Sequence, residues 1–555
     1  MTADRPLPSP RRSRQVVGLL LAALAVGGAL RAALLLAERP LTGDEIFTYA
    51  QATGHLGEYQ QVRLHDAPPQ GRWVSAGEWK RFLRIEQPFC FGRIASDLAV
   101  YDTHPPMFEW ALHLWTLAYG TGARQGLLLN LVFDTLAAAL LWRLAARITR
   151  DEVFAALAVL LWAASPASLW TFDQIRPYSL LGLWILAFGS VLLRVMDPSA
   201  RLRLWHYLLL AVVTGFGLLV HVLAWFAVAL ACLWIVAALV RRNPGRMLAS
   251  LAAAAGGGAI FFAAHPAMWT LVRRLPYVGP LNDVGPFLAR ASKLAAASAG
   301  YVVEPRTLRA LLDLAGTWLL AVIGLVAVVL LALAGRLLWR RRAIVEYWAR
   351  ATVFAERFAF AAFASLAVVI AGLYLFSLMH FHAMDVQYLS MIWPLATLAL
   401  AVALRPLGRT GVTGALALAT VLAASSVAAI ALWRGLPDPR ERVPVEIAAA
   451  ERVLHDSVSS RLFQLAEALP DDASVYAAPR AMIIAHPEEA LKGLTGEAFY
   501  PSVRGGPAQT RERAMLLQVL QFDEKVEEIG TAQGHWVLYL IMPPEPAAEP
   551  KGENP

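Results

Sequence analysis

The chain has 555 residues, of which 58% are hydrophobic and only 16% are charged. Soluble domains carry far more charge than this, so the composition excludes an ordinary soluble enzyme and predicts an all-α polytopic membrane protein. The formal net charge of +8 does not indicate nucleic acid as a partner. The arginine clusters flank apolar runs, where basic residues anchor cytoplasmic loops.

Apolar runs of ~20 residues, the length that a helix needs to cross a bilayer, recur along most of the chain. The basic clusters between them fall on one side, which predicts a cytoplasmic N-terminus (residues 1–15) and an external C-terminal tail. We therefore expect a multi-pass protein of the plasma or inner membrane, with its first span retained as a signal anchor. Hydropathy predicts about eleven spans, at Val16–Ala37, Gly126–Ala146, Val153–Trp170, Tyr178–Leu193, Tyr207–Leu219, Ala224–Val240, Met247–Ala264, Leu314–Ala334, Phe358–Met379, Leu389–Leu404 and Val412–Trp433.

The spans and the loops between them form a predicted transmembrane domain, residues 16–433, with long external loops at residues 38–125 and 265–306. In the first loop, "FEWALHLWTLAYG" has the spacing of a helix that lies at the membrane interface. Residues 434–542 turn polar and mix helical spacing ("SSRLFQLAEAL", "RERAMLLQVLQF") with strand-like runs ("ASVYAA", "HWVLYLIM"), which predicts a small external α/β domain. Residues 543–555 have the composition of a disordered tail.

Four segments on the external side carry the residues that could do chemistry. "LRAALLLAERPLTGDEIFTYA" leads from the first span into an Asp44–Glu45 pair, and "YDTHPPMFEWALHLW" carries His104. "FDQIRPYSLLGLWILAFGSVLL" carries Asp173 and Arg176 ahead of the fourth span, and "VQYLSMIWPLATLAL" opens the tenth. Each motif alone is weak, but their order and their shared side of the membrane make the combination specific.

In this order and placement, the segments resemble those of the GT-C glycosyltransferases, in the branch of the protein O-mannosyltransferases and the lipid A aminoarabinose transferase. The resemblance runs from Gly18 to Leu404. It implies transfer of a sugar from a polyprenyl phosphate donor to an acceptor hydroxyl at the external face, usually with inversion and without a metal or other cofactor. The implied partners are this donor, membrane lipids and an acceptor that the sequence leaves open among glycan, lipid and protein.

The resemblance assigns the general base to Asp44, with Glu45 orienting the acceptor or tuning its neighbour, because adjacent carboxylates resist joint ionisation. Asp173 is the next acid on the same side, and its alternative role is an ion pair with Arg176. The alternative for the Asp44–Glu45 pair is purely structural, since "TGDE" is also typical of a helix N-cap followed by first-turn acids.

The departing lipid phosphate needs cations or hydrogen-bond donors, and the sequence offers several. His104 stands where relatives often carry lysine, with the alternative of capping a proline-ordered turn. Gln174 and Gln387 depart from the glutamate and arginine of relatives, and Gln387 is followed by the expected Tyr388. The remaining candidates are Arg176, His221 at the end of the fifth span, and Arg273 and Arg274, for which headgroup anchoring is the alternative.

Two other readings compete with a transferase. A transporter also has charges near its spans, but the chain shows no inverted repeat, and its charges gather in loops rather than at the midplane. An inactive scaffold is the second, supported by the Gln174 and Gln387 departures. Asp134, inside the second span, is expected to face other helices and to pair with Arg143 or Asn130. "HFHAMD" is too weak a pattern to predict a metal.

Overall fold

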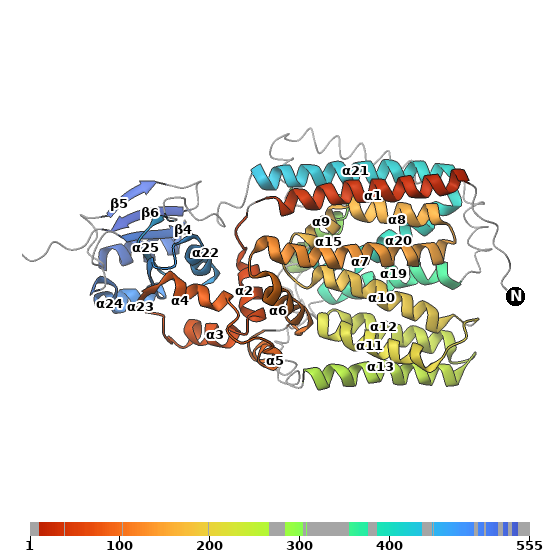
Figure 1. Ribbon diagram of the computed structural model, residues 1–555, viewed down its shortest axis with the longest axis horizontal. Helices are drawn as coiled ribbons and strands as arrows, with labels where there is room; N and C mark the ends of the chain where they lie inside the picture. Colours follow the sequence, from red (N-terminus) through yellow and green to blue (C-terminus); the bar gives the residue numbers. More distant parts are fainter. Residues whose placement is uncertain are drawn as a thin grey trace, which may run out of the picture. The chain divides into compact units, whose positions relative to one another are not determined.

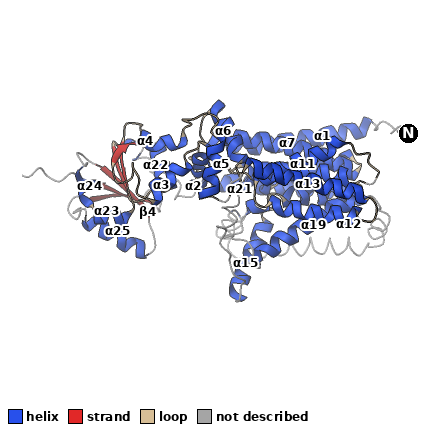
Figure 2. Ribbon diagram, turned by 90° about the horizontal axis from the view of Figure 1, so that it is seen from below, coloured by secondary structure: helices blue, strands red, loops and turns tan. Residues whose placement is uncertain are grey.

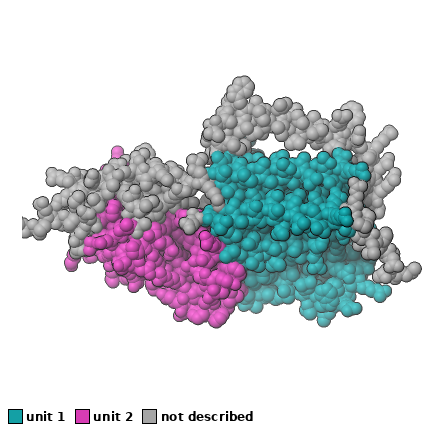
Figure 3. Space-filling model, turned by 45° about the horizontal axis from the view of Figure 1, so that its top comes forward, with its two compact units in different colours: residues 1–38, 102–108, 126–435 teal, residues 39–101, 109–125, 436–555 magenta. Residues whose placement is uncertain are grey.

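The computed structural model describes residues 10–37, 39–102, 104–197, 199–265, 284–303, 307, 354–375, 386–435, 447, 449–492, 498–503, 507–519, 526–530 and 536–541. These fall into two compact units, which Figure 3 draws in different colours. Unit 1 comprises residues 1–38, 102–108 and 126–435, and unit 2 comprises residues 39–101, 109–125 and 436–555.

Unit 1 is built of helices that run along one another (Figure 1). Within the described ranges, six helices are long and apolar enough to cross a membrane, and a bent pair, α8 with α9, makes a possible seventh span. The predicted span Leu314–Ala334 lies outside the described residues. The helices are α1 (Pro10–Leu35), α7 (Ala123–Thr149), α8 (Glu152–Ala164), α9 (Pro166–Phe172), α10 (Tyr178–Met196), α11 (Leu204–Val220), α12 (Ala224–Leu239), α13 (Pro244–Ala264), α15 (Val284–Ala299), α19 (Phe354–Leu375), η2 (Val386–Leu389), α20 (Ile392–Leu404), η3 (Arg405–Leu407) and α21 (Arg409–Gly435).

The predicted span Val153–Trp170 is bent, because the helix breaks at Ser165 and α9 leaves α8 at 60°. Pro166 has no N–H to continue the helix, so the last carbonyl groups of α8 need other partners. Ser165 donates to the carbonyl of Trp162 through both its backbone N–H and its hydroxyl, at 3.1 and 3.0 Å. The Ser426 hydroxyl on α21 donates to the Ala164 carbonyl at 2.8 Å.

The Ala163 carbonyl is satisfied by a buried arginine of α1. Arg31 donates through Nη1 to this oxygen at 3.2 Å and through Nη2 to the Ser168 hydroxyl on α9, so it joins both sides of the break. Its Nε donates to Asp134 of α7, whose other oxygen accepts from the indole of Trp162 at 3.2 Å. The expected pairing of Asp134 with Arg143 or Asn130 is therefore wrong. The side chain turns toward α1, where a full positive charge is buried.

Unit 2 contains a six-stranded sheet with helices around it (Figures 1 and 2). The strand order is β1-β3-β2-β4-β6-β5, with β2 parallel to β3 and β4 and the other pairs antiparallel. The strands are β1 (Trp73–Ser75), β2 (Arg452–His455), β3 (Ser474–Ala477), β4 (Ala498–Val503), β5 (Val526–Gly530) and β6 (Trp536–Ile541). The predicted strands in "ASVYAA" and "HWVLYLIM" are confirmed as β3 and β6.

The helices of unit 2 come from both ends of the chain. The first-loop segment supplies α2 (Gly43–Ala52), α3 (Leu56–Leu64), α4 (Ala76–Lys80), η1 (Arg81–Leu83), α5 (Phe91–Tyr101) and most of α6 (Met107–Tyr119). The tail supplies α22 (Ser460–Ala468), α23 (Arg480–Ala485), α24 (Pro487–Lys492) and α25 (Pro507–Val519). The unit thus holds part of the predicted external loop 38–125 together with the tail, and β1 pairs with β3 to join them.

We predict that Arg31→Met lowers the free energy of unfolding by about 3–5 kcal/mol, because it leaves the Asp134 carboxyl group buried without its cation. The double variant R31M/D134L should lose less than R31M alone, since the orphaned charge is gone. Unfolding by denaturant in mixed micelles measures both. Arg409→Met, at an exposed position, is the control and should change stability by no more than about 0.5 kcal/mol. A double variant less stable than R31M would contradict the role of the ion pair.

Candidate active site

The Asp44–Glu45 pair lies in the first turn of α2, and Glu45 has a structural role there. Thr42 is the N-cap, and its hydroxyl accepts from the backbone N–H of Glu45 at 3.4 Å, while Glu45 Oε2 accepts from the N–H of Thr42 at 2.9 Å. Arg39 donates to both carboxylate oxygens of Glu45, at 2.7 and 2.8 Å. The capping box and the bidentate arginine satisfy the Glu45 carboxylate, which explains how this charged group can be only 2% exposed.

Asp44 is outside the capping box and its side chain is exposed. Only its backbone carbonyl is used locally, accepting from the Thr48 hydroxyl at 2.9 Å. The N-cap interpretation of "TGDE" is therefore confirmed for Thr42 and Glu45, and the catalytic role of Asp44 stays a prediction. Thr42 and Glu45 make the cap, and the Asp44 carboxylate is held on a rigid first turn where it can reach a solute.

A second group of candidate residues comes together in unit 1. The ring of His221, in the turn between α11 and α12, lies 5.5 Å from that of His104 and 6.0 Å from that of Tyr178, centroid to centroid. Tyr178 opens α10 and contacts Tyr388 of η2 at 6.1 Å. His104 Nδ1 bonds to Asp102 at 2.9 Å, which fixes the orientation of the His104 ring. Three segments that are far apart in the sequence thus meet at His221, and a fourth joins them through Tyr178.

His221 presents a hydrogen-bond donor to this group. Its Nδ1 accepts from the backbone N–H of Leu223 at 3.1 Å, so in the neutral ring the proton is on Nε2. Nε2 is buried and has no hydrogen-bond partner among the residues that the structure describes. Burial lowers the pKa of His221 well below 6.5, and the charges of His104 and Arg176 lower this pKa further, against a smaller opposing effect of Asp102. The ring is therefore a neutral donor at physiological pH.

Close packing holds His221 beside α10. A side chain at Gly217, four residues before His221, would overlap the indole of Trp184 on α10, because a Cβ there would lie 1.9 Å from the ring. The Trp184 indole N–H donates to the Val213 carbonyl of α11 at 2.8 Å. The missing side chain lets α11 approach α10, which brings the end of α11 to Tyr178.

The loop that carries Asp173 and Arg176 joins α9 to α10 and is held in place by α7. The amide nitrogen of Asn130 on α7 donates to the carbonyls of Phe172 and Gln174, at 2.9 and 2.5 Å. The side chains of Asp173 and Arg176 are half-buried, and Arg176 is near enough to His221 for its charge to lower the pKa of that ring.

Gln387 and Tyr388 both belong to this group. The Gln387 amide oxygen accepts from the indole N–H of Trp170 on α9 at 3.0 Å. An arginine, which the resemblance to the GT-C glycosyltransferases leads us to expect here, has no acceptor to offer that indole. The departure at Gln387 thus coincides with a local bond that only an acceptor side chain could make.

Sequence reasoning missed some residues and named others that cannot be placed. Asp102 and Arg39, which orient His104 and Glu45, lie within two of the quoted motifs, but their partners show only in three dimensions. Tyr178 stood in a quoted motif without a role. Arg273, Arg274 and "HFHAMD" lie outside the described residues. Among the residues that are described, no group of three histidine, cysteine or acidic side chains could hold a metal ion.

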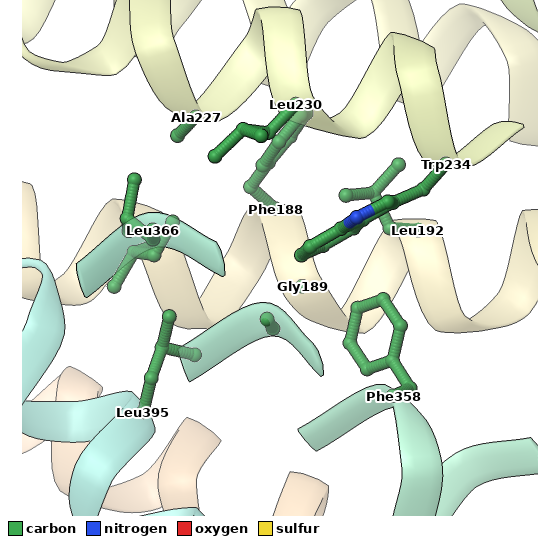
Figure 4. A pocket seen from close by; sticks show the side chains of 11 residues that line it. Phe188, Gly189, Leu192, Ala227, Leu230, Trp234, Phe358, Leu366 and Leu395 are labelled. Atoms are coloured by element: carbon green, nitrogen blue, oxygen red, sulfur yellow. The ribbon is translucent and has the colours of Figure 1, made fainter. Parts of the chain in front are cut away.

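An apolar pocket lies between helices of unit 1 (Figure 4). It is partly open, has room for about 30 Å³ of water-sized solute, and is lined by hydrophobic and aromatic side chains from α10, α12, α19 and α20. Phe188 and Trp234 project into it from α10 and α12 (Figure 4). The lining residues are Ile185, Phe188, Gly189, Leu192, Ala227, Leu230, Trp234, Phe358, Ala362, Leu366 and Leu395.

Residues 103–269 match the family model described as dolichyl-phosphate-mannose-protein mannosyltransferase. The fold is similar to that of ArnT from Cupriavidus metallidurans, in its crystal structure bound to undecaprenyl phosphate (TM-score 0.53) and in its apo structure (TM-score 0.52). Each comparison covers 94% of this chain and 98% of that chain, at 12% sequence identity. The family match and the likeness in fold both support the predicted resemblance to the GT-C glycosyltransferases. No curated protein matches it in sequence. The family match includes His104, Asp173, Arg176 and His221.

We predict that His221→Asn makes the protein less sensitive to acid. Because folding lowers the pKa of His221, the unfolded chain binds more protons between the folded pKa and about 6.5, and stability falls as the pH drops through that window. Thermal unfolding at pH 7.5 and pH 5 should therefore differ less in His221→Asn than in the wild type. His486→Asn, at an exposed histidine, should keep the wild-type difference. An unchanged pH difference in His221→Asn would show that His221 is not buried in its neutral form.

Proposed function

We propose that this protein is a membrane glycosyltransferase of the GT-C type, which moves a sugar from a polyprenyl phosphate donor to an acceptor hydroxyl at the external face of the membrane. The N-terminus is cytoplasmic and the tail external in this proposal, as the basic loops predict. The observation that carries it is the arrangement along α10 and α12. Donor groups gather where these two helices begin, and an apolar pocket lies further along the same helices.

The spacing along the helices fits an amphiphilic ligand. The pocket residues of α10 lie 7 to 14 positions after Tyr178, which at 1.5 Å per residue places them roughly 10 to 20 Å from the cluster of Tyr178, His104 and His221. On α12, Ala227 and Trp234 follow His221 by a similar number of residues. A phosphate among the polar groups would therefore have its apolar chain in the pocket. ArnT of C. metallidurans was crystallised with a molecule of this class, undecaprenyl phosphate.

The cluster suits a leaving phosphate. When the bond between the anomeric carbon and the phosphate oxygen breaks, negative charge grows on the phosphate, and preorganised donors lower the energy of that state. The neutral Nε2–H of His221 and the Arg176 guanidinium supply one neutral and one charged donor. His104, oriented by Asp102, is the third candidate.

In this proposal Asp44 takes the proton from the acceptor hydroxyl as its oxygen attacks the anomeric carbon. The attack on the face opposite the phosphate inverts the configuration. Glu45 keeps the first turn of α2 rigid through Thr42 and Arg39. The Asp44 carboxylate is therefore already oriented when the acceptor binds. Asp173 is the alternative base.

The direct test uses purified protein in nanodiscs, supplied with labelled polyprenyl phosphate sugars and a detergent extract of envelope acceptors. Release of free polyprenyl phosphate coupled to labelling of an acceptor supports the proposal, and mass spectrometry of the labelled product identifies acceptor and sugar. Absence of discharge with every sugar tested, from protein that still binds the lipid, would leave the inactive scaffold. Movement of intact donor between leaflets would leave the transporter.

We predict that Gly189→Leu impairs the use of long-chain donors. Gly189 lines the pocket, and a Cβ there meets no atom closer than 3.9 Å, so the backbone has room for a side chain at this position. We expect KM for an undecaprenyl-length donor to rise about tenfold or more, the loss of roughly 1.4 kcal/mol of apolar contact. KM for a donor with one or two isoprene units should hardly change, because such a chain ends before the pocket.

Gly372→Leu on α19 is the matched control, because its Cβ would meet no atom within 4 Å and the residue is outside the pocket lining. It should leave both KM values at their wild-type level. Equal effects of Gly189→Leu on long and short donors, or no effect on either, would show that the lipid chain lies elsewhere.

We predict that Asp44→Asn lowers turnover by roughly 10² to 10⁴, because it keeps the shape of the side chain but removes its basicity. Donor binding, measured separately by quenching of tryptophan fluorescence, should survive. Asp472→Asn, at another exposed aspartate of unit 2, should retain wild-type turnover. Normal turnover in Asp44→Asn would eliminate Asp44 as the base and make Asp173→Asn the next variant to measure.

A further inference from the structure

The turn that carries Asp44 is held by a residue more than four hundred positions later in the chain. Leu41 precedes the N-cap, so its carbonyl is outside the helical ladder, which starts with the bond from the Ile46 N–H to the Thr42 carbonyl. The side-chain amide of Gln464, on α22, donates to the Leu41 carbonyl at 2.8 Å. Gln464 is 5% exposed and Leu41 is 8% exposed, so water competes little for this bond.

The position of Gln464 is fixed by its neighbour on α22. The ring of Phe463 lies edge-on to Tyr59 of α3 at 5.2 Å and to Phe82 of η1 at 5.7 Å, and it approaches Trp79 of α4 at 6.4 Å, all centroid to centroid. Phe463, Phe82 and Trp79 are at most 1% exposed. Four interlocked aromatic rings leave α22 little freedom to rotate or slide. The amide of Gln464 is thereby presented at one place.

If Leu41 moves, Asp44 moves with it by nearly the same distance. The capping box and the bonds from Arg39 to Glu45 join residues 39 to 45 into one short, cross-linked turn. A turn of this kind moves as a body, and it is anchored through Leu41 to the tail. α22 also packs against α2 itself and against α4 (Figure 1).

We propose that Gln464 is a positioning residue for the Asp44 carboxylate, and that α22 of the tail is in this way part of the catalytic machinery. This rests on the proposed function, which makes Asp44 the base. The tail then sets the distance between the base and the acceptor hydroxyl. Loss of the Gln464 bond lets the turn shift, and a shift of ~1 Å in a catalytic group can cost ~10² in rate.

The test compares Gln464→Leu, which has no polar group, with Gln464→Glu, which keeps the shape but offers no N–H to the Leu41 carbonyl. We expect both to lower kcat about 10- to 100-fold while the donor KM stays within twofold of the wild type. Asp471→Ala is the matched control. It removes the bonds that Lys80 and Arg84 make to Asp471, which also link the first loop to the tail, without touching α2. It should leave kcat within twofold.

A double-mutant cycle with Asp44→Asn separates positioning from general stability. If Gln464 acts through Asp44, Gln464→Leu adds almost nothing in the Asp44→Asn background. Equal losses in both backgrounds overturn the proposal, since the residue would then support the fold and not the base. Unchanged kcat in Gln464→Leu and Gln464→Glu overturns it as well.

Amide hydrogen exchange gives a readout that does not depend on turnover. Gln464→Leu should speed exchange at residues 43–48 and leave strands β2 and β3 protected, which also shows that the variant is folded. Unchanged exchange at residues 43–48 counts against the anchoring role. Failure of the proposed function looks different: wild-type protein would then discharge no donor, or Asp44→Asn would turn over normally, whatever the state of Gln464.

Discussion

The arrangement of unit 1 depends on one buried arginine at a broken helix. Inside a membrane, a carbonyl group released by a helix break has no water to bind, and each unsatisfied group costs several kcal/mol. Arg31 fills this need at the Ala163 carbonyl, and its own charge is balanced by Asp134. Because the same guanidinium reaches Ser168, it also fixes the direction in which α9 leaves the break. A polar network of this kind tolerates no missing member.

The direction of α9 then determines where the polar cluster can form. α9 ends at the loop with Asp173 and Arg176, and that loop leads directly into α10, which begins with Tyr178. The contact of Gly217 with Trp184 brings the turn with His221 to the same end. The chemistry-bearing side chains are thus placed by backbone features that are themselves apolar or fully hydrogen-bonded. The positions of these side chains follow from the break at Ser165, the loop between α9 and α10, and Gly217.

Much of this could be predicted from the sequence, but not all of it. Hydropathy and charge predict the polytopic class, and the order of the motifs predicts the resemblance to the GT-C glycosyltransferases, because both are local patterns. The break at Ser165 could not be predicted, because the twelve buried apolar residues of α8 outweigh one proline in any hydropathy window. The partner of Asp134 escaped because Arg31 is 103 positions away. Likewise, "TGDE" could not show which acid makes the cap and which is exposed, since both fit the first turn equally well.

The pairing of β1 with β3 has a consequence for biosynthesis. Residues 73–75 leave the ribosome about 400 residues before residues 474–477, and at ~5–20 residues per second that gap lasts roughly 20–80 s. During this time the first-loop segment has no sheet to join, and its aromatic side chains lack Phe463. Unit 2 can close only after every helix of unit 1 has been synthesised. The sheet is therefore completed only at the end of synthesis. A chain truncated before β3 exposes the apolar side chains of an incompletely folded first-loop segment, which chaperones or proteases can recognise.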